Sequence, residues 1–200
     1  MRELLEAVAA GDVSPAAAEA ELAGYATGES GRFDATREQR SGVPEAVLSD
    51  GKTPAEVADL AATSLSTTGR AIATRVDEAH VTAIRERLHA AEPEATVRWS
   101  ERSNYVVAHA PDYERPDIDA SVGVVTAGTS DAVPAGEAAM IVREMGAAVE
   151  RVDDVGVASL VRVVDQLPVL RERDVLIVAA GREGALPTVV AGLVDVPVIA

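Results

Sequence analysis

Small and hydroxyl-bearing residues follow an apolar run in the segment Gly128-Thr129-Ser130-Asp131. Backbone N–H groups of such a loop can approach an anion, and the start of a following helix favours negative charge. Ser130 or Asp131 could equally do no more than cap that helix. The sequence has neither a GxGxxG dinucleotide fingerprint nor a P-loop lysine, so any phosphate site here would be of another type.

Carboxylates stand out in two further segments. Asp153-Asp154-Val155-Gly156 offers paired carboxylates, which serve as acid–base groups, as metal ligands or merely as helix caps. Gly181-Arg182-Glu183-Gly184 places one glutamate between two glycines, directly after a strongly apolar run. A glutamate so placed can carry a proton in a reaction, or it can lie in a solvated turn.

Basic residues gather in the N-terminal half. Residues 32–45 contain Arg32, Arg37 and Arg40, together with the only phenylalanine of the chain. Arginine clusters bind phosphate through paired hydrogen bonds, although charged pairs on a surface helix give the same pattern. Lys52 is the only lysine among 18 basic residues, which favours a function that needs a compact ammonium group. The three histidines lack a ligand spacing and are expected at the surface.

Alternating strands and helices must position the three loops. Strands are predicted at 121–126, 149–152, 174–179 and 196–200, with helices at 134–146, 157–165 and 185–194. Continuous apolar strands joined by helices imply a parallel sheet covered on both faces, as in flavodoxin-like or Rossmann-like three-layer folds. Ligands bind at the carboxyl ends of such strands, so the three loops should meet there. The apolar face of the first helix is predicted to comprise Ala138, Ile141, Val142 and Met145.

Residues 1–116 are predicted to form a separate, small α+β domain. The pattern is helical to residue 27, with Ser14 as a helix cap, and extended or irregular over 28–44. Strands are expected at 46–48, 71–76, 96–99 and 105–108, and helices after the caps Thr53 and Asp77. The polar, proline-bounded segment 111–117 is a plausible linker to the α/β domain over 117–200.

Charge excludes several functions. The chain has 33 acidic and 18 basic residues, a net charge of −15, which repels nucleic-acid backbones and anionic lipid. No long apolar stretch or signal peptide is present, so we expect a cytoplasmic protein with neither nucleic-acid nor membrane partners. Acidic excess with one lysine favours a high-salt cytoplasm, or alternatively a GC-rich genome. The chain has no cysteine, and its apolar end at 196–200 leads us to expect further chain beyond Ala200.

Several motifs resemble the PurE family of aminoimidazole ribonucleotide carboxylases. The match is closer to its relative, the LarB family of pyridinium-3,5-biscarboxylic acid mononucleotide synthases in nickel-pincer cofactor biosynthesis. The N-terminal motif is Phe33-Asp34, Arg37-Glu38-Gln39-Arg40, Gly42-Val43-Pro44-Glu45 and Gly51-Lys52-Thr53-Pro54. The later motifs are Thr126–Asp131, Asp154–Ala158, Gly181–Pro187 and Gly192–Ile199. Together they span nearly the whole chain.

The resemblance implies a reaction and an assembly. A LarB-type enzyme carboxylates C5 of the nicotinate ring of nicotinic acid adenine dinucleotide with CO2 or bicarbonate. It also hydrolyses the phosphoanhydride and releases AMP. The resemblance further implies a catalytic cysteine outside these 200 residues, no tightly bound cofactor, and a homo-oligomer such as the PurE octamer. Asp154 is a candidate ligand of Mg2+.

Residue roles follow by resemblance. Glu183, Ser130 and Asp131 would be catalytic, with Glu183 positioning CO2 or transferring a proton. The substrate would contact Gly128, Thr129, Asp154, Gly156, Gly181, Gly184 and Leu186. The AMP half would contact Arg37, Arg40 and Lys52, or these residues would brace the site. Two alternatives stay open: a PurE-type carboxylase acting on an imidazole ribonucleotide, and a nucleotide-binding domain without catalysis.

Overall fold

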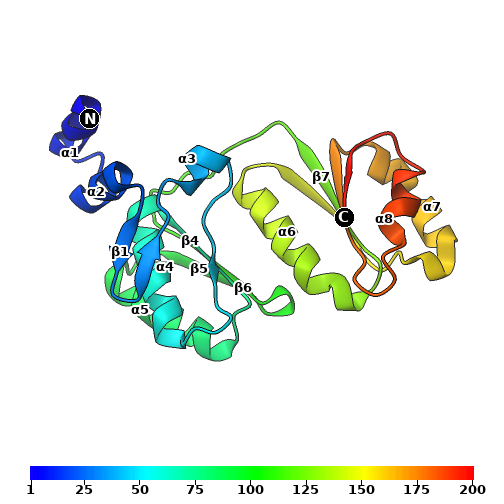
Figure 1. Cartoon of the computed structure of the whole chain (residues 1–200), viewed down its shortest axis with the longest axis horizontal. Helices are drawn as coiled ribbons and strands as arrows, with labels where there is room; N and C mark the ends of the chain where they lie inside the picture. Colours follow the sequence, from blue (N-terminus) through cyan, green and yellow to red (C-terminus); the bar gives the residue numbers. More distant parts are fainter. The chain divides into compact units, whose positions relative to one another are not determined.

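A computed structural model describes all 200 residues, except for the side chains of Glu3 and Glu21. The chain divides into two compact units, Met1–Glu114 and Arg115–Ala200 (Figure 1). The division falls inside the polar segment 111–117. None of the helices described is long and apolar enough to cross a membrane.

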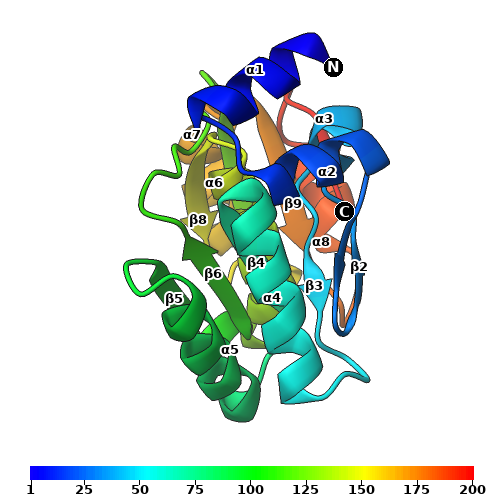
Figure 2. The same ribbon diagram turned by 90° about the vertical axis from the view of Figure 1, so that its left-hand side faces the viewer.

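The first unit is built on a four-stranded sheet with the order β3-β4-β6-β5. β3 is parallel to β4, whereas β4 pairs antiparallel with β6, and β6 with β5. The strands are β3 (Val47–Leu48), β4 (Arg70–Thr74), β5 (Thr96–Ser100) and β6 (Tyr105–His109). Two helices, α4 (Pro54–Thr68) and α5 (Glu78–Ala91), cover one face (Figure 2) and bury Val57, Ile84 and Leu88 against it. A 3-10 turn, η1 (Glu101–Ser103), joins β5 to β6.

Both helices of this unit begin at predicted caps. The Thr53 side chain accepts a hydrogen bond from the Glu56 backbone, and Asp77 accepts one from the His80 backbone. The surface position expected for His80 is wrong, because this residue is only 9% exposed. Its ring lies against Asp77 Oδ1 at 2.6 Å and against the Lys52 carbonyl at 3.2 Å. A polar residue at the third position of a helix can thus be buried by completing the cap.

The N-terminal segment contains more elements than predicted. Instead of one helical stretch there are α1 (Arg2–Ala10) and α2 (Pro15–Ala23), separated by Gly11 in a left-handed conformation. A hairpin of β1 (Ala26–Gly28) and β2 (Gly31–Phe33) follows, and then the short helix α3 (Arg37–Ser41). The hairpin agrees with the extended or irregular structure expected over 28–44, whereas α3 shows that this expectation is wrong for residues 37–41. Asp59 of α4 holds the hairpin, since its carboxylate accepts the Ser30 N–H at 2.8 Å.

The second unit is the expected α/β fold. Its four strands are all parallel, in the order β10-β9-β7-β8. They are β7 (Ser121–Thr126), β8 (Ala148–Val152), β9 (Val175–Ala179) and β10 (Val198–Ile199). α6 (Ala132–Glu144) packs on one face through Ala135 and Ala139. α7 (Leu160–Arg171) and α8 (Leu186–Ala191) pack on the other face through Val163 and Leu186. The two faces follow from the right-handed crossovers between parallel strands. The chain crosses the sheet in one direction from β7 to β8 and in the opposite direction from β8 to β9 and on to β10. The helix α6 therefore lies on one face, and α7 and α8 lie on the other.

Two helix predictions differ from the structure. α6 buries Ala135, Ala139 and Met140, whereas the predicted face around Ile141 and Met145 is only half-buried. Small alanines let the helix approach the sheet closely, and Val142 of the predicted face packs only at the margin of this core. α7 continues through Pro168 to Arg171 instead of ending at 165. Pro168 is exposed, so water can satisfy the carbonyl that loses its helical partner.

Candidate active site

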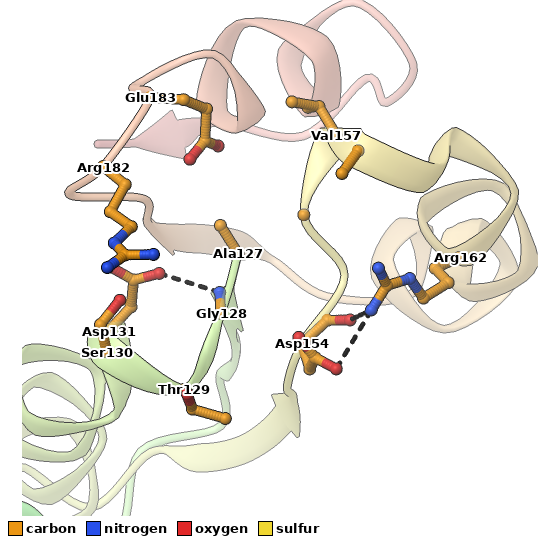
Figure 3. A pocket seen from close by; sticks show the side chains of 12 residues that line it. Ala127, Gly128, Thr129, Ser130, Asp131, Asp154, Val157, Arg162, Arg182 and Glu183 are labelled. Atoms are coloured by element: carbon orange, nitrogen blue, oxygen red, sulfur yellow. Dashed lines mark hydrogen bonds and ion pairs between the residues drawn. The ribbon is translucent and has the colours of Figure 1, made fainter.

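Three loops converge at the carboxyl edge of the parallel sheet. They follow β7, β8 and β9, and they line a cavity of about 630 Å³ (Figure 3). Chains leaving the neighbouring strands β7 and β9 turn to opposite faces of the sheet, which opens a crevice between them. The lining residues are Ala127, Gly128, Thr129, Ser130, Asp131, Asp154, Gly156, Val157, Ala158, Arg162, Arg182 and Glu183. Two 3-10 turns, η2 (Thr129–Asp131) and η3 (Val157–Ser159), begin the segments after β7 and β8.

Asp131 joins the first loop to the third. One carboxylate oxygen accepts the Gly128 N–H at 2.9 Å, and the other accepts the Gly181 N–H at 2.9 Å. The residue is only 5% exposed. Because both oxygens are engaged with backbone donors, this geometry suits a brace between two loops better than an acid or base. Sequence reasoning placed Asp131 in the site but had no means of finding the Gly181 contact, 50 residues away.

The second loop is fixed against the end of β7. The Gly156 N–H donates to the Ala127 carbonyl at 2.9 Å, and the Val155 N–H donates to the Thr126 carbonyl at 3.0 Å. A Cβ atom at Gly156 would lie 2.7 Å from the Ala127 carbonyl oxygen. The position therefore demands glycine because of close backbone approach.

Replacing Gly156 with Ala should destabilise the second unit by about 1–3 kcal/mol, as overpacking does elsewhere. The added methyl group meets backbone that cannot turn aside. Urea unfolding measures the effect. Gly192→Ala is the matched control, since a Cβ atom there meets nothing closer than 3.6 Å. Equal stability of the two variants would contradict the close-approach argument.

The charges on the cavity wall differ in how they are compensated. Asp154 Oδ2 accepts a hydrogen bond from Arg162 at 3.1 Å. Figure 3 shows the Glu183 carboxylate pointing into the space between the loops, and the Arg182 side chain extending toward Ser130 and Asp131. Within the described part of the chain, neither Arg182 nor Glu183 has a polar side-chain partner. These two residues carry the uncompensated charges of the cavity.

Most of the predicted C-terminal site residues meet here. Gly181 lies just outside the cavity wall, and Gly184 is exposed in a left-handed turn with a φ of 63°. Leu186, predicted to contact substrate, is fully buried in the core beneath the loop, so its side chain is not available to a ligand. Sequence reasoning missed Arg162 and Arg182. Arg182 lies within the predicted loop Gly181–Gly184, and Arg162 lies four residues after the motif Asp154–Ala158, so their proximity was a usable signal.

The arginines of the N-terminal motif lie in the first unit and are paired. Arg40 donates to both oxygens of Asp34, at 3.0 and 2.7 Å, and Arg37 lies 3.3 Å from Glu45. The hydrogen bond from Arg40 lowers the pKa of the Asp34 carboxyl, whereas burial raises the pKa of Glu45. Lys52 Nζ donates to the Leu48 carbonyl at 2.7 Å. Their predicted contact with an AMP group stays a prediction.

A Mg2+ site also stays a prediction. Among the described side chains, no three histidine, aspartate or glutamate residues gather as a metal site would require. Asp154 alone could supply a ligand, and its carboxylate already pairs with Arg162. Sites of this kind take one or two carboxylates together with phosphate oxygens of the substrate.

The second unit, a parallel sheet with a polar cavity at its carboxyl edge, has the α/β fold expected of a PurE-like domain. Residues 25–108 match the LarB/PurE-like N-terminal domain. An uncharacterized protein of Methanocaldococcus jannaschii, MJ0165, is 34% identical over 170 residues. That match covers 84% of this chain and 66% of the relative, so the chain spans about two thirds of the relative's length. The match places the first unit, over residues 25–108, in the LarB/PurE-like N-terminal domain family.

Proposed function

We propose that this chain binds nicotinic acid adenine dinucleotide and takes part in carboxylating C5 of its nicotinate ring, with release of AMP. The observation that carries the proposal is the convergence of three loops, one of them bearing an unpaired carboxylate, in one cavity at the carboxyl edge of the parallel sheet. Its volume of about 630 Å³ lies within the range of about 300–1,000 Å³ typical of ligand sites. The match of residues 25–108 to the LarB/PurE-like N-terminal domain supports the reaction class.

The cavity offers a place for each part of a nucleotide. The first N–H groups of η2 and the hydroxyls of Thr129 and Ser130 suit a phosphate. The guanidinium of Arg182, which extends over this turn, adds a positive charge (Figure 3). Asp154 and Arg162 suit a ribose hydroxyl and a second phosphate oxygen. The nicotinate ring would then lie between the loops, beside Glu183.

The chemistry needs a nucleophile, a carboxyl source and a base. A pyridinium ring attacks CO2 only after a nucleophile has added to it and made C5 electron-rich. The sequence has no cysteine, and we assign the adding nucleophile to no residue of this chain. The residues of the cavity bind and orient the nucleotide. Glu183 takes the C5 proton after the new carbon–carbon bond has formed, and loss of the nucleophile then restores the aromatic ring.

Mass spectrometry tests the proposal. Here and in the rate measurements below, the protein is used together with the nucleophile-bearing segment that the family resemblance implies outside these 200 residues. It is incubated with nicotinic acid adenine dinucleotide and isotopically labelled bicarbonate. We expect AMP and a pyridinium dicarboxylate mononucleotide that carries the label. Labelled product from aminoimidazole ribonucleotide instead would assign the PurE-type reaction. Tight binding of the dinucleotide without turnover would indicate a nucleotide-binding domain, and failure to bind it would overturn the proposal.

A further inference from the structure

Asp154 stands in a backbone conformation that aspartate rarely adopts. Its φ is 59°, in the left-handed region that favours glycine. Such a residue persists only where its surroundings hold it, and these conformations cluster at functional loops. Asp154 is also the residue of the second loop whose carboxylate lines the cavity.

The Thr126 hydroxyl holds this conformation. Thr126 is the last residue of β7 and is only 1% exposed. Its Oγ1 accepts the Asp154 N–H at 3.0 Å and donates its own proton to Asp153 Oδ1 at 3.1 Å. One buried hydroxyl therefore engages two consecutive residues of the loop, as acceptor for one and donor for the other.

Asp154 in turn sets the position of Arg162. A single guanidinium nitrogen, Nη1, donates to the Asp154 carbonyl at 2.8 Å and to Asp154 Oδ2 at 3.1 Å. The backbone and the side chain of Asp154 thus both fix the arginine on the cavity wall. The contacts run from Thr126 through Asp154 to Arg162, without a direct contact between the first and the last.

We propose that Thr126 is a positioning residue for nucleotide binding, acting through Asp154 on the Arg162 guanidinium. The inference rests on the proposed function for the identity of the ligand, a nicotinate ribonucleotide. Thr126 itself touches no ligand, because its side chain is buried beneath the loop. Its hydroxyl, and not the volume of its side chain, is the group that matters.

Three variants of the whole chain test this proposal. Thr126→Val keeps the shape but removes both hydrogen bonds, and Thr126→Ser keeps the hydroxyl. Calorimetry with nicotinic acid mononucleotide should show about tenfold weaker binding for Thr126→Val, the effect of losing one hydrogen bond between Arg162 and the nucleotide. Thr126→Ser should recover most of that affinity. Thr188→Val, at an exposed threonine of α8, is the control and should bind as the wild type does.

A double variant separates positioning from general damage. Because Thr126 acts through Asp154 on Arg162, adding Thr126→Val to Arg162→Gln should weaken binding by a smaller factor than Thr126→Val does in the wild type. Additive losses would overturn the proposal. So would equal losses for the serine and valine variants, which would assign the effect to packing.

Amide exchange keeps this inference separate from the proposed function. The Asp154 N–H should be protected in the wild type and in Thr126→Ser, and should exchange quickly in Thr126→Val. If the three proteins show this exchange pattern but the wild type does not bind the mononucleotide, the proposed ligand is wrong. The role of Thr126 in fixing the conformation of the loop then still holds. An Asp154 N–H that stays protected in Thr126→Val would overturn that role.

Discussion

Replacing Glu183 with Gln should lower the rate of carboxylation by about 10²–10⁴-fold, the usual contribution of a positioned general base. Nucleotide binding should be nearly unchanged. Glutamine has the shape of glutamate but cannot take the C5 proton. The Glu183 side chain has no polar partner in the described structure, so the substitution breaks no contact of the fold. The measurements are single-turnover kinetics and the dissociation constant of nicotinic acid adenine dinucleotide.

Glu150→Gln is the matched control, since Glu150 is an exposed glutamate of the same unit that does not line the cavity. It should carboxylate at the wild-type rate. Exchange of the C5 proton with solvent offers a second readout, which should slow in Glu183→Gln alone. Wild-type turnover in Glu183→Gln would remove Glu183 from the mechanism. A large loss of binding would instead assign it to substrate recognition.

The meeting of the three loops was predictable from sequence, because it follows from strand direction alone. Apolar runs alternating with helices give a parallel sheet, and the loops after its strands must then share one edge. The contacts of Thr126 and Asp131 were not predictable in the same way. Thr126 meets Asp154 only because β7 and β8 pair with Val125 opposite Val152, and sequence periodicity does not fix that register.

The sequence also could not predict which arginines pair with a carboxylate. Arg40 lies within the N-terminal motif and Arg162 lies four residues after the motif Asp154–Ala158, and both are paired with aspartate. Arg182 has Glu183 beside it in the chain, yet its side chain extends toward Ser130 and Asp131 (Figure 3). Sequence spacing alone does not distinguish a paired arginine from an unpaired one, since the direction of a long side chain depends on the turn that carries it. In a protein of net charge −15, an arginine without a carboxylate partner is a place where an anionic ligand can bind.

Asp131→Asn should destabilise the second unit by about 2–4 kcal/mol, because a buried acceptor of two hydrogen bonds becomes part donor. The carboxylate accepts from Gly128 and Gly181 through separate oxygens. Asparagine keeps one oxygen and presents an NH2 group to the other N–H, so one hydrogen bond is lost and two donors face each other. The first and third loops would separate, and the cavity between them would lose its shape. Urea unfolding measures the stability.

Asp165→Asn is the control for Asp131→Asn, because Asp165 is exposed on α7. The free energy of unfolding of Asp165→Asn should stay within about 0.5 kcal/mol of the wild-type value. The same two variants separate a brace from a catalytic group. A brace predicts that Asp131→Asn loses stability and nucleotide affinity together, since both depend on the joined loops. A catalytic acid or base predicts wild-type stability and binding with slow turnover. That second result would return Asp131 to the catalytic role that the family resemblance implies.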